Sequence, residues 1–176
     1  MSSLTGPGGR VTVKTPVNRL SFSGLKVSSR SNYALRALID LAQHSNGQPV
    51  QLHDVAQRTG ISAKYLEQIL VALKPTGIVR SRAGIHGGYT LGRAPSAIKV
   101  GEVIRHLDGP LAPMACASVT AHQTCDNCWD EETCSLRSLW FDVRNAISEI
   151  LDQTSIADVL SRGQRLEVLK VAYHSG

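Results

Sequence analysis

All four cysteines of this 176-residue chain lie in one short stretch, with the spacing Cys116-x8-Cys125-x2-Cys128-x5-Cys134. The residues between them are polar and rich in turn formers, so the stretch cannot form an apolar core of its own. Either disulfides or a metal centre must hold it in shape. We recognise no secretory signal and expect a cytoplasmic protein, where clustered thiolates predict ligands for an iron–sulfur cluster or for zinc. A disulfide-forming thiol switch is the alternative.

Charge is distributed unevenly along the chain, whose formal net charge is +5. Residues 25–95 carry nine basic and three acidic side chains, whereas residues 96–176 carry seven basic and eleven acidic ones. A basic front half indicates contact with a polyanion such as nucleic acid, although a solvated surface with uneven charge would look the same. No apolar run is long enough to span a bilayer, so we expect no contact with a membrane.

The basic half contains a predicted helix-turn-helix. The first helix of this half, 28–44, is apolar on nearly all sides, which predicts a buried position. Helices at 52–58 and 63–74 are separated by a tight turn at Gly60, a residue that readily adopts a positive φ. Ser62 can cap the second of them. Two short helices around a tight glycine turn are typical of helix-turn-helix proteins, and an ordinary helical hairpin is the alternative.

A β-hairpin is predicted directly after these helices. Alternating residues at 78–82 and 89–91 predict two strands, and the glycine-rich residues 83–88 predict the loop that joins them. After a helix-turn-helix, such a hairpin is typical of the wing of a winged-helix protein. The side chains that would present positive charge to DNA phosphates are Arg80, Arg82, His86 and Arg93.

The helix at 63–74 is the predicted recognition helix. We expect Glu67 and Gln68 on its exposed side, where glutamine can pair with adenine and glutamate can accept a hydrogen bond from cytosine. The simpler interpretation of Glu67 is a plain surface residue. Lys64 and Tyr65 are predicted phosphate contacts, and Ser62 completes the predicted DNA-binding set.

The acidic half predicts a connecting helix at 100–107, then the cysteine stretch, and then a long amphipathic helix at 135–153. Apolar residues of the long helix recur every three or four positions along one stripe, and its other face is charged. Because this stripe lies outside the winged-helix unit, it predicts a dimer interface, with packing on the chain's own core as the alternative. The predicted interface residues are Leu136, Leu139, Trp140, Val143, Ile147 and Ile150.

Three segments resemble the Rrf-two family of bacterial transcription regulators: residues 31–38 (SNYALRAL), 61–70 (ISAKYLEQIL) and 87–91 (GGYTL). The cysteine stretch followed by LRSLW (residues 136–140) resembles the iron–sulfur members of that family, such as IscR, NsrR and RirA. The resemblance covers about residues 25–160. It implies a homodimeric winged-helix repressor or activator that binds a palindromic double-stranded DNA operator and responds to its cluster.

The resemblance also bears on the cluster ligands, because the family commonly has three cysteines with similar gaps. Cys128 and Cys134 match the second and third of these, and either Cys116 or Cys125 takes the first position. The resemblance therefore implies that Cys128 and Cys134 are ligands.

The fourth ligand of the family is not a cysteine. Its two candidate places here hold Asn32 and Arg137, neither of which is a usual ligand, and the equal-gap position among the cysteines holds His122. The ligand set is therefore either all four cysteines or three of them with His122. Whether the cluster is [2Fe–2S] or [4Fe–4S] stays open.

The predicted fold class is mainly α: a winged helix-turn-helix with a small β-hairpin wing and a long C-terminal dimerisation helix. The predicted function is sequence-specific transcription regulation, as a repressor that senses iron, redox state or nitric oxide through the cluster. A zinc-stapled or thiol-switch regulator without a cluster is the alternative. We expect no enzyme, since no nucleophile–base pair or phosphate loop is recognisable. The predicted divisions are a disordered or mis-annotated arm (1–24), the DNA-binding domain (25–95), the connecting helix and cysteine loop (96–134), the dimerisation helix with a short final helix (135–165) and a tail (166–176).

Overall fold

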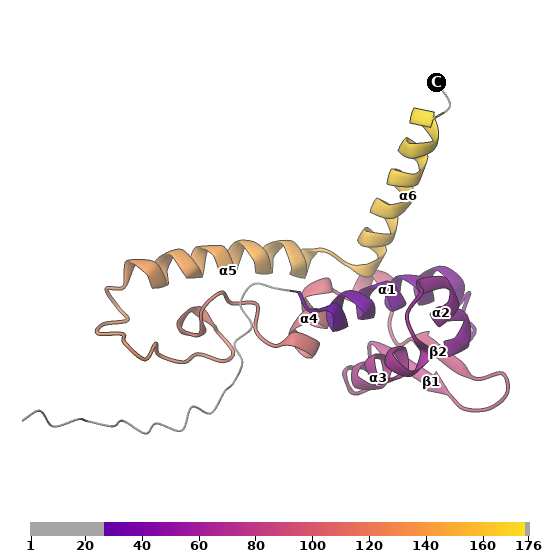
Figure 1. Cartoon of the computed structure of the whole chain (residues 1–176), viewed down its shortest axis with the longest axis horizontal. Helices are drawn as coiled ribbons and strands as arrows, with labels where there is room; N and C mark the ends of the chain where they lie inside the picture. The colour runs from indigo at the N-terminus through magenta and orange to yellow at the C-terminus, as the bar shows by residue number, and fades with distance from the viewer. Residues whose placement is uncertain (1–26, 175–176) are drawn as a thin grey trace, which may run out of the picture.

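The computed structural model describes residues 27–174, so the prediction for residues 1–24 lies outside the described part of the chain. Figure 1 shows the helix-turn-helix and the hairpin gathered at one end of the molecule. Helix α5 extends away from them, and α6 projects upward from the place where α5 ends. The described chain is mainly helical with one two-stranded antiparallel hairpin, which confirms the predicted fold class. None of its helices is long and apolar enough to cross a membrane.

Helix α1 (Ser29–His44) is the central helix of the core, and it begins where the sequence predicted. The Ser28 hydroxyl caps it by accepting a hydrogen bond from the Ser31 amide at 3.1 Å. The same serine donates from its amide and its hydroxyl to the Asp108 carboxylate at the end of α4. Cap and carboxylate together fix the start of α1 against α4 (Val100–Asp108).

Helices α2 (Leu52–Thr59) and α3 (Ala63–Leu73) form the predicted helix-turn-helix. Gly60 ends α2 in the left-handed conformation with φ +69°, which allows the tight turn. The buried Asp40 carboxylate of α1 accepts two hydrogen bonds of 2.8 Å from the Arg58 guanidinium of α2. This bidentate pair attaches the helix-turn-helix to α1.

Strands β1 (Val79–Arg82) and β2 (Gly88–Leu91) pair antiparallel and form the predicted hairpin, which we call the wing. Val50 adds a short bridge, because its amide and carbonyl bond with the carbonyl and amide of Tyr89 at 2.9 and 2.8 Å. Gly88 makes this approach possible: its φ is +148°, and an added Cβ would lie 2.2 Å from the Val50 carbonyl oxygen. The wing is thereby joined to the segment that enters α2.

One apolar core joins the winged helix to the C-terminal half. Short 3-10 turns, η1 (Lys74–Thr76) and η2 (Pro95–Ala97), flank the wing. Helix α6 enters this core with its first residue, since the Ile156 amide donates to the Ile98 carbonyl at 3.0 Å. The largest fully buried side chains are Leu38, Leu41, Leu66, Ile69, Leu70, Leu73, Ile78, Ile98 and Ile156, followed by Val55, Val79 and Val103.

Helix α5 (Ser135–Gln153) matches the predicted helix, and it follows the cysteine loop and the short 3-10 turn η3 (Ala115–Ala117). The last helix, α6 (Ile156–His174), is longer than the short helix that the sequence predicted. The residues after Gly163 are mostly good helix formers and contain no proline, so nothing in the sequence ends the helix early. The predicted division of the chain into domains stays a proposal.

We predict that Gly88→Ala disrupts the wing, because the new methyl group would collide with the Val50 carbonyl and strain the backbone. The free energy of unfolding should fall by about 1–3 kcal/mol, measured by chemical denaturation. The control is Gly163→Ala in α6, where an added Cβ meets nothing within 4 Å and should be neutral or stabilising. Equal stability of the two variants would contradict the requirement for glycine at position 88.

Candidate nucleic-acid interface and cysteine loop

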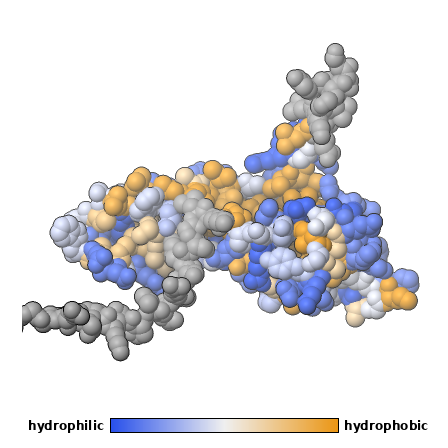
Figure 2. Space-filling model, in the orientation of Figure 1, coloured by the Kyte–Doolittle hydropathy of each residue, from blue (hydrophilic) through white to orange (hydrophobic). Residues whose placement is uncertain are grey.

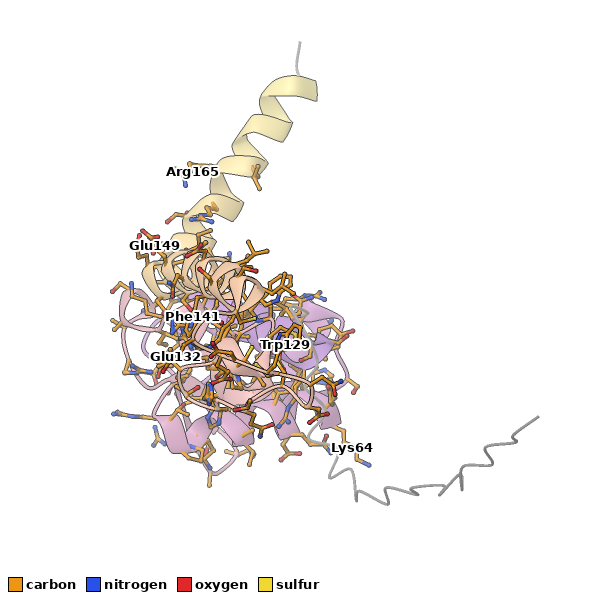
Figure 3. The ribbon with its side chains drawn as sticks, turned by 90° about the vertical axis from the view of Figure 1, so that its left-hand side faces the viewer. Lys64, Trp129, Glu132, Phe141, Glu149 and Arg165 are labelled. Carbon is orange, nitrogen blue, oxygen red and sulfur yellow. The ribbon has the colours of Figure 1, made fainter. Side chains whose placement is uncertain are left out.

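The exposed side of α3 carries the predicted recognition residues. Lys64, Glu67 and Gln68 are all exposed, and Ser62 is exposed while its hydroxyl accepts from the Tyr65 amide at 3.4 Å. In Figure 3, Lys64 lies at the edge of the molecule opposite the projecting end of α6. Tyr65 is half-buried, with its ring edge-to-face against Tyr33 at a centroid distance of 6.0 Å. The ring of Tyr65 therefore belongs partly to the core.

The wing brings further exposed groups beside this helix. Arg80, Arg82 and His86 are exposed, as a phosphate-contacting role requires. The sequence did not point to two residues at this surface. The side-chain amide of Gln51, at the start of α2, donates a hydrogen bond to the Ile85 carbonyl at 3.3 Å. Ile85 lies at the wing tip and is 86% exposed. The position of Ile85 inside the glycine-rich loop could have predicted that its side chain is exposed at the wing tip.

The cysteine loop (residues 116–134) connects α4 to α5, and Figure 1 shows it lying alongside α5. All four thiols are free. Cys116, in η3, is buried with only 4% of its surface exposed, whereas Cys125, Cys128 and Cys134 are half-buried. The Cys128 amide donates to the Cys125 carbonyl at 3.0 Å, so these two cysteines share one turn. The loop thus presents three partly accessible thiols beside one that is enclosed.

Polar contacts order the rest of the loop. The Asp130 carboxylate accepts from the Glu132 amide at 2.9 Å and from the Thr133 hydroxyl at 2.5 Å, and these bonds lower the pKa of Asp130. His122, the alternative ligand, lies with Nε2 3.2 Å from the Glu131 carboxylate. Trp129, labelled in Figure 3 on the loop, is fully exposed.

Two thiols have raised pKa values. Burial raises the pKa of Cys116, and a hydrogen bond with the Cys125 thiol raises it further. Partial burial likewise raises the pKa of Cys128. Both groups therefore favour the protonated thiol in the metal-free chain, and binding a metal would release their protons. The Cys125 thiol therefore lies near Cys116.

The donor set fits an iron–sulfur cluster or zinc in its chemistry, since four thiols without a disulfide lie in one loop. Within residues 27–174, however, no three histidine, cysteine or acidic side chains lie close enough together to hold a metal ion. The described loop therefore has the required ligands but would have to close further to bind either group.

Helix α5 leaves its apolar stripe uncovered, and Figure 2 shows hydrophobic surface running along it. No residue of α5 is fully buried. Leu136 and Ile150 are each 62% exposed and Leu139 is 49% exposed. The remaining predicted interface residues, Trp140, Val143 and Ile147, are half-buried.

The face that α5 turns toward its own chain is polar instead. The Arg105 guanidinium of α4 donates twice, at 2.6 Å, to the Asp152 carboxylate of α5, and it also reaches the Ser148 hydroxyl at 3.4 Å. At the other end, Nε of Arg137 donates to the Cys116 carbonyl at 3.1 Å. These contacts lie roughly 120° around the helix from the apolar stripe. A single chain therefore leaves much of the apolar face of α5 exposed.

A helix-turn-helix with a hairpin wing, both carrying exposed polar and basic side chains, defines a winged-helix transcription regulator. The chain belongs to the Rrf2 (Rrf-two) family: its residues 27–162 match the family model described as an iron-dependent transcriptional regulator. These findings confirm the predicted family and a non-enzymatic, regulatory function.

Individual relatives agree with this assignment. The chain is 36% identical over 144 residues to the HTH-type transcriptional regulator IscR of Yersinia enterocolitica, with 82% of this chain and 84% of that protein covered. Its structure is similar to that of CymR, the global cysteine regulator of B. subtilis, with a TM-score of 0.64, 35% identity and coverage of 78% and 98%. IscR of T. potens is similarly close, with a TM-score of 0.62, 37% identity and coverage of 80% and 89%.

Proposed function

We propose that the chain is a homodimeric repressor that binds a palindromic operator in the cytoplasm and senses iron, redox state or nitric oxide through an iron–sulfur cluster. The observation that carries this proposal is the position of the four thiols, which lie in the loop between the winged helix and α5. The match to an iron-dependent regulator family supports the role of iron. Anaerobic purification followed by absorption spectroscopy tests it, since an iron–sulfur protein shows visible charge-transfer bands.

The residues that would hold the cluster are Cys116, Cys125, Cys128 and Cys134. When bound, the cluster would supply a centre whose charge and integrity change with oxidants, nitric oxide and iron supply. Thiolates are the soft, charged donors that iron–sulfur clusters require, and the loop offers no other cysteine.

The loop is well placed to change the position of α5. Cys134 is the residue that immediately precedes α5, and the Cys116 carbonyl is bound by Arg137 in the first turn of that helix. Any rearrangement of the four thiols therefore acts on the start of α5 in two ways, through the chain at Cys134 and through the hydrogen bond from Arg137 to Cys116. In a dimer, a shift of α5 changes the spacing of the two recognition helices, which must match half-sites about one turn of DNA apart.

The DNA contacts follow from what α3 and the wing expose. Glu67 and Gln68 would read base edges in the major groove, because they lie exposed in the middle of α3. The proposed phosphate contacts, which position the protein without reading sequence, are Ser62, Lys64, Tyr65, Arg80, Arg82 and His86.

The dimer would form through α5. Its inner face makes polar contacts to its own chain, whereas Leu136, Leu139 and Ile150 of its apolar stripe are exposed. A long helix with such a stripe is typical of helix-to-helix dimer interfaces, in which each chain covers the other. The proposed interface residues are Leu136, Leu139, Trp140, Val143, Ile147 and Ile150.

A thiol switch is a second candidate, because Cys125 lies near Cys116 and a two-electron oxidant such as a peroxide could convert the two thiols to a disulfide. A zinc-stapled loop would use the same thiolates without a redox response. A colourless protein that contains zinc, or that contains no metal, would select one of these alternatives.

We predict that Cys128→Ser and Cys134→Ser each give a colourless or unstable protein, because serine is a poor donor to iron. Iron and acid-labile sulfide are measured after anaerobic reconstitution. His122→Ala is the matched control and should keep its cluster if all four ligands are cysteines. Full clusters in both serine variants would rule out this ligand assignment.

We predict that Val143→Asp with Ile147→Asp abolishes the dimer, because burying unpaired charge costs about 3–5 kcal/mol. The dimer dissociation constant, measured by light scattering and sedimentation, should rise at least about 100-fold, and specific DNA binding should fail with it. Ser138→Asp with Asn145→Asp places the same charges off the stripe and should leave the dimer intact. A monomeric unmodified protein at micromolar concentration would refute the interface.

We predict that the wing and α3 contribute differently to DNA binding. Arg82→Ala should weaken binding to every sequence and lower the salt dependence by roughly one unit of slope per lost phosphate contact. Glu67→Ala should instead relax the preference at one base pair, by about 1–3 kcal/mol. Titrations with operator and random DNA at several salt concentrations separate the two effects. Uniform loss in both variants would show that Glu67 does not read a base.

A further inference from the structure

Arg137 occupies an unusual position in the first part of α5. Its Nε donates to the Cys116 carbonyl at 3.1 Å, and its Nη1 donates to the Glu131 carbonyl at 3.3 Å. Cys116 begins the cysteine loop, and Glu131 lies near its end. One guanidinium group therefore connects both ends of the loop to α5.

A third contact fixes the orientation of this guanidinium. Its central carbon lies 4.9 Å from the centroid of the Phe141 ring, one turn further along α5. Among the ion pairs of residues 27–174, none involves Arg137. The side chain thus uses its fork of donors on backbone carbonyls, which a planar and permanently charged guanidinium does well. Its two hydrogen bonds therefore help to fix the conformation of the cysteine loop.

The contact has a direct consequence for Cys116. Eight residues separate this cysteine from Cys125, which is enough chain for it to lie far from the other thiols. Instead it is held in η3, buried, with its thiol beside that of Cys125. The amide of Gln123 donates to the Ala115 carbonyl at 3.3 Å and folds the intervening segment back on η3. Arg137 binds the next carbonyl of η3, that of Cys116.

We propose that Arg137 is a positioning residue that clamps the cysteine loop and holds Cys116 in η3, near Cys125, as one of the four donors. A guanidinium is always protonated and has no lone pair for a metal, so Arg137 acts on the loop only through the hydrogen bonds that it donates. The assignment of Cys116 as a donor rests on the proposed cluster, whereas the clamp itself does not.

The clamp is tested on the full-length, metal-free, reduced protein by the rate of iodoacetamide alkylation at each cysteine, followed by peptide mass spectrometry. In the unmodified protein, Cys116 should react more slowly than Cys128 and Cys134, because it is buried. Arg137→Gln should accelerate alkylation of Cys116 about tenfold or more, since bonds to a charged donor are lost. The rates at Cys128 and Cys134 should change by less than about threefold, which a general loosening of the protein would not produce.

Two further variants keep the test specific. Arg144→Gln removes a guanidinium from the same helix whose hydrogen bond reaches only the adjacent Asn145, and it should leave the rate at Cys116 unchanged. Arg137→Lys keeps the charge but cannot span both carbonyls, so it should resemble Arg137→Gln. Full protection of Cys116 by lysine would show that charge alone suffices and would overturn the clamp, as would an unchanged rate in Arg137→Gln. Thermal unfolding confirms that each variant is folded.

Reconstitution separates the clamp from the proposed function. If the unmodified protein holds a cluster, Arg137→Gln should contain less than about half as much iron and sulfide after identical anaerobic treatment, because Cys116 would no longer be held in position to bind. A protein that holds no cluster, but in which Arg137→Gln still exposes Cys116, would refute the cluster and support the clamp. A cluster-containing protein in which Arg137→Gln changes neither alkylation nor iron content would refute the clamp alone.

Discussion

The rest of the structure depends on the burial of α1. Its Ala34 and Ala37 are fully enclosed and let neighbouring helices approach closely, while Leu38 and Leu41 fill the space between them. The helix contacts α2, α3, α4, α6 and β2, so both the winged helix and the C-terminal half pack on it. Each buried leucine contributes roughly 1.5–3 kcal/mol, which makes this the largest connected source of stability among the described residues. The positions of α3 and of the start of α6 are both set from α1.

Helix α5 is attached to this core in a different way. Its C-terminal end is anchored because the Val100 amide donates to the Thr154 carbonyl at 2.9 Å and Ile156 enters the core. Near this same end, the partly exposed Arg105–Asp152 pair adds only about 0–1 kcal/mol, and at the start of the helix Arg137 donates to the Cys116 carbonyl. Leu136, Leu139 and Ile150 of its apolar stripe stay exposed and add little to this attachment. The helix is therefore fixed at one end and weakly held elsewhere.

Periodicity and turn chemistry predicted most of the fold. The apolar spacing of α5, the glycine turn at Gly60 and the alternation of the wing are local signals, and each gave the correct element within one or two residues. The sequence predicts a shorter α6 because Gly163, a poor helix former, stands inside this helix. Nor could the sequence show which face of α5 meets the chain itself, since that depends on where Arg105 and Arg137 lie in space. For the same reason, the sequence shows that Arg137 is an unsuitable ligand but does not show that it binds two backbone carbonyls of the loop.

These two attachments suggest how a signal in the loop would reach DNA. A rearrangement that moved Cys116 would pull on Arg137 at the start of α5, the end of the helix that lies farthest from Thr154 along the chain. The anchored end at Thr154 would then act as the pivot, so the movement would be largest where two chains meet and smallest beside α1. Because α3 is held rigidly to α1 through the buried leucines, each recognition helix would keep its own structure. Only the distance and angle between the two recognition helices of a dimer would change, and this is the quantity to which a palindromic operator responds.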